Sequence, residues 1–254
     1  MRWDPVQYTR YADERGRPFH DLVGRVGATA PRRVVDVGCG PGTLTASLAE
    51  RWPDAAVQGI DSSEEMIASA AALNSRADFR VADARSWTPP PDTDVLVSNA
   101  TLQWVPGHQG VLARWAAALP DGAWLAVQVP GNFGSPSHTL MRELAESERW
   151  RARLDGVLRH HDSVASPEEY AQLLLSAGLV ADVWETTYVH VLGGADPVLE
   201  WVRGTGLRPI LAALPATETA EFEDEYARRL RAAYPATPRG TLFPFRRIFA
   251  VGHK

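Results

Sequence analysis

The sequence predicts an α/β protein with a doubly wound, mostly parallel sheet of seven strands and helical insertions that form a cap. One observation is the regular alternation of strand-like and helix-like runs between residues 31 and 130. Another is the stretch 34–43, where a buried apolar strand runs into a glycine-rich turn and then a helix. The seven strands are expected at 33–38, 56–61, 78–83, 93–99, 123–129, 180–191 and 246–252.

Helices are expected between these strands and in two later segments. Phe19 and Leu22 begin an apolar helical pattern in the leader, residues 1–30. A capping box from Ser62 to Glu65 predicts the start of the helix after the second strand. Ser166, followed by a proline, predicts the start of a helix that ends near residue 178.

No linker or repeat interrupts this pattern, so a single domain is expected over residues 1–254. The leader 1–30 precedes a core at 31–130, and 131–165 and 195–240 are the helical insertions. Residues 166–194 and 241–254 complete the sheet.

Composition excludes several classes of protein. The chain of 254 residues is 45% hydrophobic and 22% charged, which is ordinary globular usage. Its net charge of −5 argues against a general nucleic-acid binder. The single cysteine, Cys39, fits a reducing compartment, and neither a signal peptide nor an apolar run of membrane-spanning length is found. We therefore expect a cytoplasmic protein without nucleic-acid or membrane partners.

The glycine turn indicates a nucleoside-bearing ligand. Gly38, Gly40 and Gly42 stand at every second position, where a Cβ would fill the space that a ligand needs. Asp61 ends the next strand, the place where an acid accepts hydrogen bonds from ribose hydroxyls. Asp36 places a second carboxylate near the ligand, which disfavours a pyrophosphate and favours an ammonium or sulfonium. The spacing differs from the G-x-G-x-x-G of dinucleotide sites, so a nicotinamide enzyme is disfavoured.

The histidines and serines offer no other catalytic centre. The seven histidines lack the spacing of helical zinc sites and have no cysteine cluster beside them, so no metal is expected. No serine lies in a G-x-S-x-G elbow, which leaves a hydrolase triad without support.

Two arginines near the end of the chain are candidates for anion binding. Arg246 and Arg247 point to opposite faces of the last strand, and each face is otherwise apolar. At least one guanidinium should be partly buried, so it needs a partner, either a protein carboxylate or a carboxylate substrate. Arg208 in a glycine-rich segment is a third candidate.

The turn 36–42 resembles the first motif of class I S-adenosylmethionine-dependent methyltransferases, which have a Rossmann-like fold. Longer phrases at 3–22, 98–104, 128–133, 206–209 and 243–249 resemble the trans-aconitate methyltransferases almost from end to end. This family transfers methyl from S-adenosylmethionine to a carboxylate of trans-aconitate. The resemblance implies a leader helix that closes over the cofactor and a small polycarboxylate substrate.

The resemblance also assigns roles to individual positions. Asp83 with the Ala84 backbone would receive the adenine amino group, although an aspartate there can also cap a helix. Asn99 would face the methionine end, and Gln103 and Trp104 would position the reactants, with Gln103 also binding substrate. Met66 would lie on the adenine face or fill the core. The expected cofactor-binding residues are Tyr8, Arg15, Asp36, Gly38, Gly40, Gly42, Asp61, Ser62, Met66, Asp83, Ala84 and Asn99, and the expected substrate-binding residues are Gln103, Arg208, Arg246 and Arg247.

No acid–base residue is expected, because a carboxylate is already ionised at neutral pH. Alternatives are a methyltransferase for another small acid or metabolite and a non-catalytic protein that kept the cofactor fold.

Overall fold

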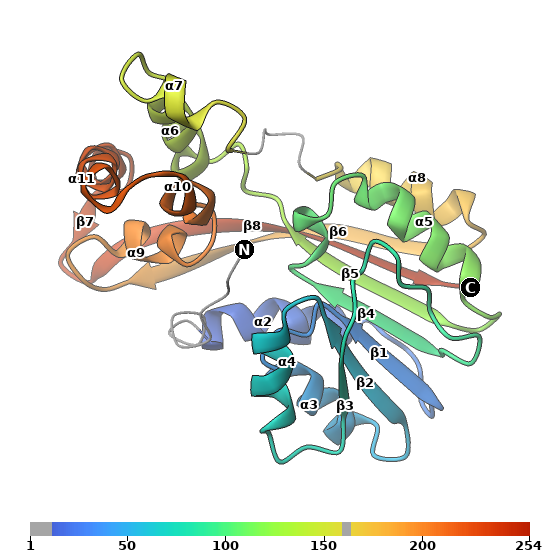
Figure 1. The fold of residues 1–254 in the computed structure, drawn as a ribbon. Helices are drawn as coiled ribbons and strands as arrows, with labels where there is room; N and C mark the ends of the chain where they lie inside the picture. The colour runs from blue at the N-terminus through green and yellow to red at the C-terminus, as the bar shows by residue number, and fades with distance from the viewer. Residues whose placement is uncertain (1–11, 159–163) are drawn as a thin grey trace. The chain divides into compact units, whose positions relative to one another are not determined.

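The structure is a computed structural model that describes residues 12–158 and 164–254, and Figure 1 shows its course. The predicted site residue Tyr8 therefore lies outside the described residues. The chain divides into two compact units. The first comprises 1–130, 164–186 and 247–254, and the second comprises 131–163 and 187–246.

The sheet has the order β3-β2-β1-β4-β5-β8-β6, with the two-residue strand β7 paired to β8. The strands are β1 (Arg33–Val37), β2 (Ala56–Asp61), β3 (Asp78–Val81), β4 (Val95–Asn99), β5 (Trp124–Pro130), β6 (Val180–Leu192), β7 (Ala236–Thr237) and β8 (Gly240–His253). The pairs β1–β2, β1–β4, β2–β3 and β4–β5 are parallel, whereas β8 is antiparallel to β5. The predicted doubly wound, mostly parallel sheet is confirmed, with β7 as a small addition.

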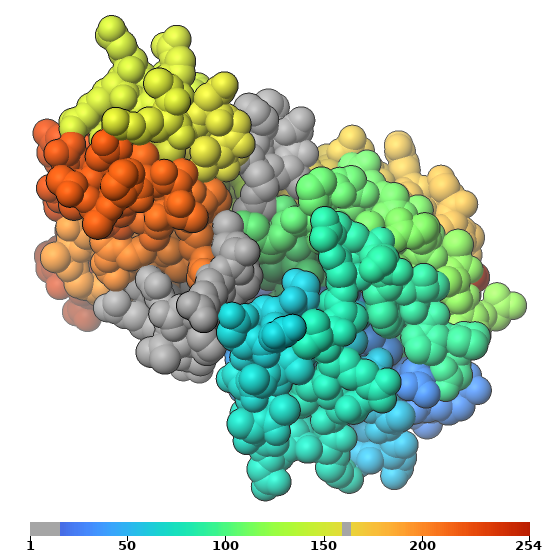
Figure 2. All heavy atoms as spheres, in the orientation of Figure 1, coloured from blue at the N-terminus to red at the C-terminus, as the bar shows by residue number. Residues whose placement is uncertain are grey.

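Helices cover both faces of the sheet in the first unit. Side chains at alternate positions of β1, β4 and β5, among them Val35 and Leu96, join one core cluster with α5 (His108–Ala118) and α8 (Pro167–Ser176). The residues between them point to the opposite face of the sheet, toward α2 (Ala12–Val23) and α3 (Thr43–Arg51), since Thr45 of α3 contacts Asp36 of β1 and α2 packs against β5. The helix α4 (Glu64–Ala71) packs on β2 and β3. Figure 2 shows side chains closing the spaces that the ribbon leaves open in this unit.

Local signals explain where most elements begin. The capping box of α8 is confirmed, because Ser166 accepts from the backbone N–H of Glu169 and the Glu169 carboxylate accepts from that of Ser166. The predicted box at Ser62 is wrong: Ser63 caps α4, and its hydroxyl accepts from the backbone N–H of Met66. Serine is a favoured N-cap residue at either position, but only Ser62 has a glutamate three residues later. The hydrogen bond from the Ser63 backbone N–H to Asp61 holds the chain so that Ser63 caps the helix.

The last strand is longer than expected. β8 begins at Gly240, not at Arg246, because Leu242, Phe243 and Pro244 continue its alternation of exposed and buried side chains. Pro244 is exposed, and a residue that cannot donate a hydrogen bond is tolerated there.

The second unit is mostly helical. It contains α6 (Pro136–Ala145), α7 (Arg151–Leu154), α9 (Pro197–Arg203), α10 (Arg208–Ala213) and α11 (Ala216–Ala233), which gather together in Figure 1. α11 packs against α6, α9 and α10. Two buried tyrosines fasten the start of α6: Tyr226 donates to the Ser137 carbonyl, and Tyr234 accepts from the Ser137 N–H at 3.0 Å. In the described part of the chain, no helix is long and apolar enough to cross a membrane.

Candidate active site

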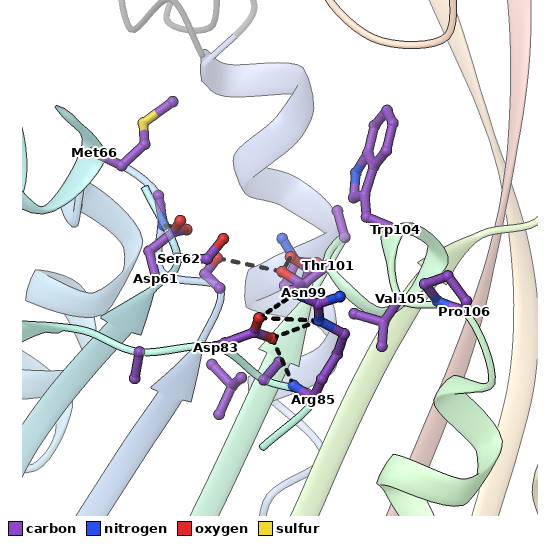
Figure 3. Close-up of a pocket in the computed structure, with 16 residues that line it drawn as sticks. Asp61, Ser62, Met66, Asp83, Arg85, Asn99, Thr101, Trp104, Val105 and Pro106 are labelled. Atoms are coloured by element: carbon purple, nitrogen blue, oxygen red, sulfur yellow. Dashed lines mark hydrogen bonds and ion pairs between the residues drawn. The ribbon is translucent and has the colours of Figure 1, made fainter. Parts of the chain in front are cut away.

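A cavity of about 400 Å³ lies in the first unit where β1, β2 and β4 end. Cavities of this size take small-molecule ligands. Figure 3 shows Met66 on one side and Trp104 on the other, with Asp61, Ser62, Asp83 and Asn99 between them. Its lining residues are Val37, Gly38, Gly40, Asp61, Ser62, Met66, Ala82, Asp83, Ala84, Arg85, Asn99, Ala100, Thr101, Trp104, Val105 and Pro106.

The three glycines of the turn have different surroundings. All have positive φ, at 79°, 55° and 82°. A Cβ on Gly38 would lie 1.9 Å from Thr101 Oγ1, and one on Gly42 would lie 2.6 Å from Ala70 Cβ. A Cβ on Gly40 would meet nothing within 4 Å. The predicted close approach of a ligand therefore has room at Gly40, whereas the other two glycines let the protein pack against itself.

Asp61 joins the glycine turn to the next loop. One of its carboxylate oxygens accepts from the Gly40 N–H at 3.0 Å, and the other accepts from the Ser63 N–H at 2.9 Å. Each oxygen keeps a further lone pair. The carboxylate is thus held in place by the backbone and can still accept from a ligand hydroxyl.

Asp36 lies behind the cavity and does not line it. Its side chain is buried, with 3% of the residue exposed, and one oxygen accepts from Thr45 Oγ1 at 2.6 Å. Burial raises the pKa of Asp36 to about 7; the Thr45 hydrogen bond opposes the rise, and the charge of Asp61 adds to it. A cation in the cavity would favour the ionised form of this buried group.

Asp83 lines the cavity together with Arg85. The guanidinium of Arg85 contacts both carboxylate oxygens, with Nη2–Oδ2 at 2.5 Å, and the Arg85 N–H donates to Oδ1 at 2.9 Å. These hydrogen bonds hold the pKa of Asp83 below its usual value. The group is therefore a carboxylate that accepts hydrogen bonds, as a partner for an amino group must be. The aspartate begins a turn at 84–86 and not a helix, so the helix-cap alternative is wrong, and the role toward adenine stays a prediction.

The end of β4 has an unusual backbone. Ala100 has φ of 53°, the only positive value of a non-glycine residue in the described ranges. Such a conformation costs roughly 1–2 kcal/mol and is kept where its surroundings enforce it. The Ala100 N–H donates to the Gln128 carbonyl at 2.9 Å, and Gln103 Nε2 donates to the Ala100 carbonyl at 2.5 Å. This turn presents Asn99 to the cavity, and Asn99 Oδ1 is buried without a hydrogen-bond partner among the described residues.

Of the two predicted positioning residues, only one lines the cavity. Trp104 lines the cavity, whereas Gln103 is buried and directs its amide nitrogen to the Ala100 backbone. Both come from the short helix η1 (Leu102–Trp104). A role for Gln103 toward substrate stays a prediction.

The three arginines predicted to bind substrate are divided between the two units. Arg247 belongs to the first, is 5% exposed, and donates from Nη1 to Gln128 Oε1 at 3.3 Å. The expectation that one of the two neighbouring guanidinium groups is buried is thus confirmed. Arg208 begins α10 in the second unit, and Arg246 of the same unit donates from Nη1 to the Gly131 carbonyl at 3.1 Å.

Eight of the expected cofactor residues line the cavity: Gly38, Gly40, Asp61, Ser62, Met66, Asp83, Ala84 and Asn99. Gly42 packs against α4, and Arg15 lies in α2. The lining residues that the sequence did not predict are Val37, Ala82, Arg85, Ala100, Thr101, Val105 and Pro106. Only Arg85 had a signal, since it follows the predicted Asp83 by two residues.

Comparisons with known proteins agree with this geometry. A family model described as a methyltransferase domain matches residues 34–122, which include the glycine turn and the end of β4. A protein of Streptomyces avermitilis named trans-aconitate 2-methyltransferase is 57% identical over 260 residues, which cover 99% of this chain and 97% of its own length. A protein of the same name from Rhodococcus jostii is 57% identical over 251 residues, 98% of each chain.

Solved structures support the fold. YcgJ from Bacillus subtilis has a TM-score of 0.64 at 16% identity, over 94% of this chain and 98% of its own. A putative methyltransferase from Bacillus halodurans has a TM-score of 0.58 at 13% identity, over 93% and 98% of the two chains. The Rossmann-like methyltransferase fold implied by the resemblance is therefore confirmed. Together with the near-full-length identity to the named relatives, this shows that the chain belongs to the trans-aconitate 2-methyltransferase family.

Proposed function

We propose that this protein transfers a methyl group from S-adenosylmethionine to a carboxylate of trans-aconitate, giving a monomethyl ester and S-adenosylhomocysteine. The main support is the 57% identity to relatives of that name along 99% of the chain. The identity extends through the second unit, which lies outside the general methyltransferase match at 34–122. Insertions of this kind distinguish substrates among enzymes that share one cofactor fold.

The cavity fits the cofactor of the family. Gly40 leaves room for a ligand at the backbone, Asp61 keeps lone pairs for ribose hydroxyls, and Asp83 is a carboxylate that can accept from the adenine amino group. The unpartnered Asn99 Oδ1 suits the ammonium at the methionine end. When bound, S-adenosylmethionine supplies an activated methyl group on a positively charged sulfur. Burial favours the protonated form of Asp36 behind the site, and the positive charge of the bound cofactor would favour its ionised form.

The reaction needs no acid or base from the protein. A substrate carboxylate has a pKa near 4 and is ionised at neutral pH. A carboxylate oxygen forms a bond to the methyl carbon while the bond from methyl to sulfur breaks and its electron pair stays on sulfur. Opposite charges disappear in this step, so exclusion of water favours it. Alignment of the three reacting atoms can contribute roughly 7–11 kcal/mol.

Binding of an acid with three carboxylates needs local positive charge, because the whole chain has a net charge of −5. Arginine is suited to this role, since its guanidinium can bind a carboxylate with two parallel hydrogen bonds. We assign the spectator carboxylates to arginines, with Arg247 and Arg208 as the first candidates, and leave the reacting carboxylate with weaker donors. A guanidinium on the reacting oxygen would withdraw charge and slow the attack.

A labelled-methyl assay tests this function. The purified protein is incubated with S-adenosylmethionine carrying a labelled methyl group and with trans-aconitate, cis-aconitate, isocitrate or a fatty-acyl malonate in turn. Transfer to trans-aconitate with the highest kcat/KM supports the proposal. Equal or better transfer to another acid would favour the alternative, a methyltransferase for a different small carboxylic acid or metabolite.

Kinetics of arginine variants test the assignment of the spectator carboxylates. R247M and R208M should raise KM for the acid at least tenfold and change kcat less, because these contacts are the same in the ground and transition states. R239M, at an exposed position of the turn before β8, is the control. Unchanged KM in both variants would contradict the assignment.

The partner is thus a small molecule, and the polycarboxylate class belongs to this proposal. The cytoplasmic location and the absence of nucleic-acid and membrane partners stay predictions.

A further inference from the structure

Next to the cavity, a row of polar side chains crosses three strands of the first unit, with Asn99 half-buried and the other two buried. Asn99 on β4 pairs in register with Gln128 on β5, which in turn pairs with Phe249 on β8. Arg247 precedes Phe249 by two residues, so it points to the same face of the sheet. Strands are spaced by about 4.8 Å, so the strand that bears Arg247 runs roughly 10 Å from the cavity wall at Asn99.

The burial of Gln128 calls for an explanation. Its side chain is in the interior at 0% exposure, and Arg247 beside it is 5% exposed. Neighbouring positions on these strands, Ala126 and Phe249, are apolar and buried. Burying polar groups in such a setting is unfavourable unless each finds a hydrogen bond.

Only half of the Gln128 amide is satisfied. Its Oε1 accepts from Arg247 Nη1 at 3.3 Å. A guanidinium can only donate, so this contact fixes which end of the amide faces the arginine. Nε2 then points away and has no hydrogen-bond partner within the described ranges. Leaving a buried donor unsatisfied is unfavourable, and a bound ligand can recover that cost.

The unpartnered side-chain atoms on β4 and β5 are one hydrogen-bond donor and one acceptor. Gln128 Nε2 is a donor, and Asn99 Oδ1 is an acceptor; neither has a partner in the part of the chain that the structure describes, so they do not bond to each other. A ligand that carries an anion beside a cation would satisfy both. The guanidinium next to Gln128 favours the anion on that side.

From this arrangement we infer that Gln128 and Arg247 form a carboxylate-binding subsite beside the cofactor cavity. Gln128 Nε2 donates to the carboxylate, while Oε1 orients the guanidinium that supplies the charge. The carboxylate comes from the acid substrate or from the methionine end of the cofactor, which have the same chemistry. The inference deepens the proposed function and rests on it.

The experiment uses two variants of Gln128 and one control. Q128M removes both polar ends at nearly the same volume, and Q128E places a negative charge against Arg247. T93V is the matched control, because Thr93 is also fully buried with an unpartnered polar atom, two residues before β4 begins and away from Asn99 at its other end. Calorimetry measures the Kd of S-adenosylhomocysteine and of 5′-methylthioadenosine, which lacks the amino-acid end. Steady-state kinetics gives KM and kcat for trans-aconitate.

Two results support the subsite and identify its ligand. A rise of at least tenfold in KM in both Gln128 variants, with Kd of S-adenosylhomocysteine within twofold, assigns it to the substrate. A tenfold rise in Kd of S-adenosylhomocysteine, with that of 5′-methylthioadenosine unchanged, assigns it to the cofactor. In either case Q128M combined with R247M should add less than twofold to the effect of R247M alone, since the amide acts with the arginine.

Other results overturn the inference. Changes below twofold in every constant would show that no carboxylate uses Gln128. Loss of 5′-methylthioadenosine binding in both variants, or an equal effect of T93V, would show that the residue only supports the sheet. Wild-type protein that binds trans-aconitate by calorimetry without methylating it would refute the proposed function and leave the subsite standing.

Discussion

Substitution of the buried aspartate behind the cavity, D36N, should make the stability of the protein relative to wild type increase as pH rises. Asp36 is 3% exposed, and burial raises its pKa to about 7 against the ordinary 3.8. A folded-state pKa above the unfolded one means that the folded protein holds this proton while the unfolded chain releases it. The stability contributed by the protonated group is therefore lost as pH rises from about 4 to about 7.

The size of the effect follows from the two pKa values. Each pKa step corresponds to 1.36 kcal/mol, so the total loss in the wild type is roughly 4 kcal/mol, of which about 2.5 kcal/mol falls between pH 5 and pH 8. The neutral amide of D36N does not titrate, and its oxygen can accept the Thr45 hydrogen bond. The buried amide nitrogen costs roughly 1–3 kcal/mol, but equally at every pH.

The measurement is the free energy of unfolding by urea at pH 5, 6.5 and 8. We expect the stability of D36N relative to wild type to increase by about 2–3 kcal/mol between pH 5 and pH 8. The titration of the other carboxylates cancels when the variant is compared with wild type. D54N, which removes an exposed carboxylate, is the control. A difference between D36N and wild type that stays constant across this range would refute the reasoning, as would the same slope in D54N.

Three further outcomes follow from the site and its supports. G38A should destabilise the fold by several kcal/mol, because its Cβ would overlap Thr101, whereas G40A should cost only about 1 kcal/mol of strain and weaken the binding of S-adenosylhomocysteine at least tenfold. Unfolding curves measure the first effect and calorimetry the second, and tighter or equal binding by G40A would contradict a ligand in the open space at that glycine. Burial raises the pKa of the Cys39 thiol, so iodoacetamide at pH 8 should label the native protein at least tenfold more slowly than the unfolded one, and equal rates by mass spectrometry would be incompatible with that burial. S166A should lower the free energy of unfolding by about 1 kcal/mol through loss of the α8 cap, and a change below 0.3 kcal/mol would show that the capping box contributes little.

The central part of the fold was predictable because its signals are local. Strand-like segments of six or seven residues located β1, β2, β4 and β5 within two residues of their bounds. The cap at Ser63 was not predictable, since the capping-box pattern points to Ser62, which has Glu65 three residues later, whereas Ser63 has Met66 there. The choice between them depends on a hydrogen bond from the backbone to Asp61, which forms only when the strand is placed.

The candidate site was predictable to the extent that residue type alone determines chemistry. Acids at strand ends identified Asp61 and Asp83, and both line the cavity. The location of Asp36 behind the cavity depends on the α3 helix, from which Thr45 reaches it. The left-handed Ala100 had no signal, because the sequence has no glycine there and its conformation results from contacts with β5 and η1.

The carboxylate of Asp61 has a consequence for how specificity can change in this protein. It holds the glycine turn with one oxygen and the entry to α4 with the other, at 3.0 and 2.9 Å. A substitution that altered sugar preference at this position would also release two loops of neighbouring strand–helix units. Adaptation to a different nucleoside would thus require a second substitution that restores the backbone hydrogen bonds, because one carboxylate serves both the ligand and the two loops.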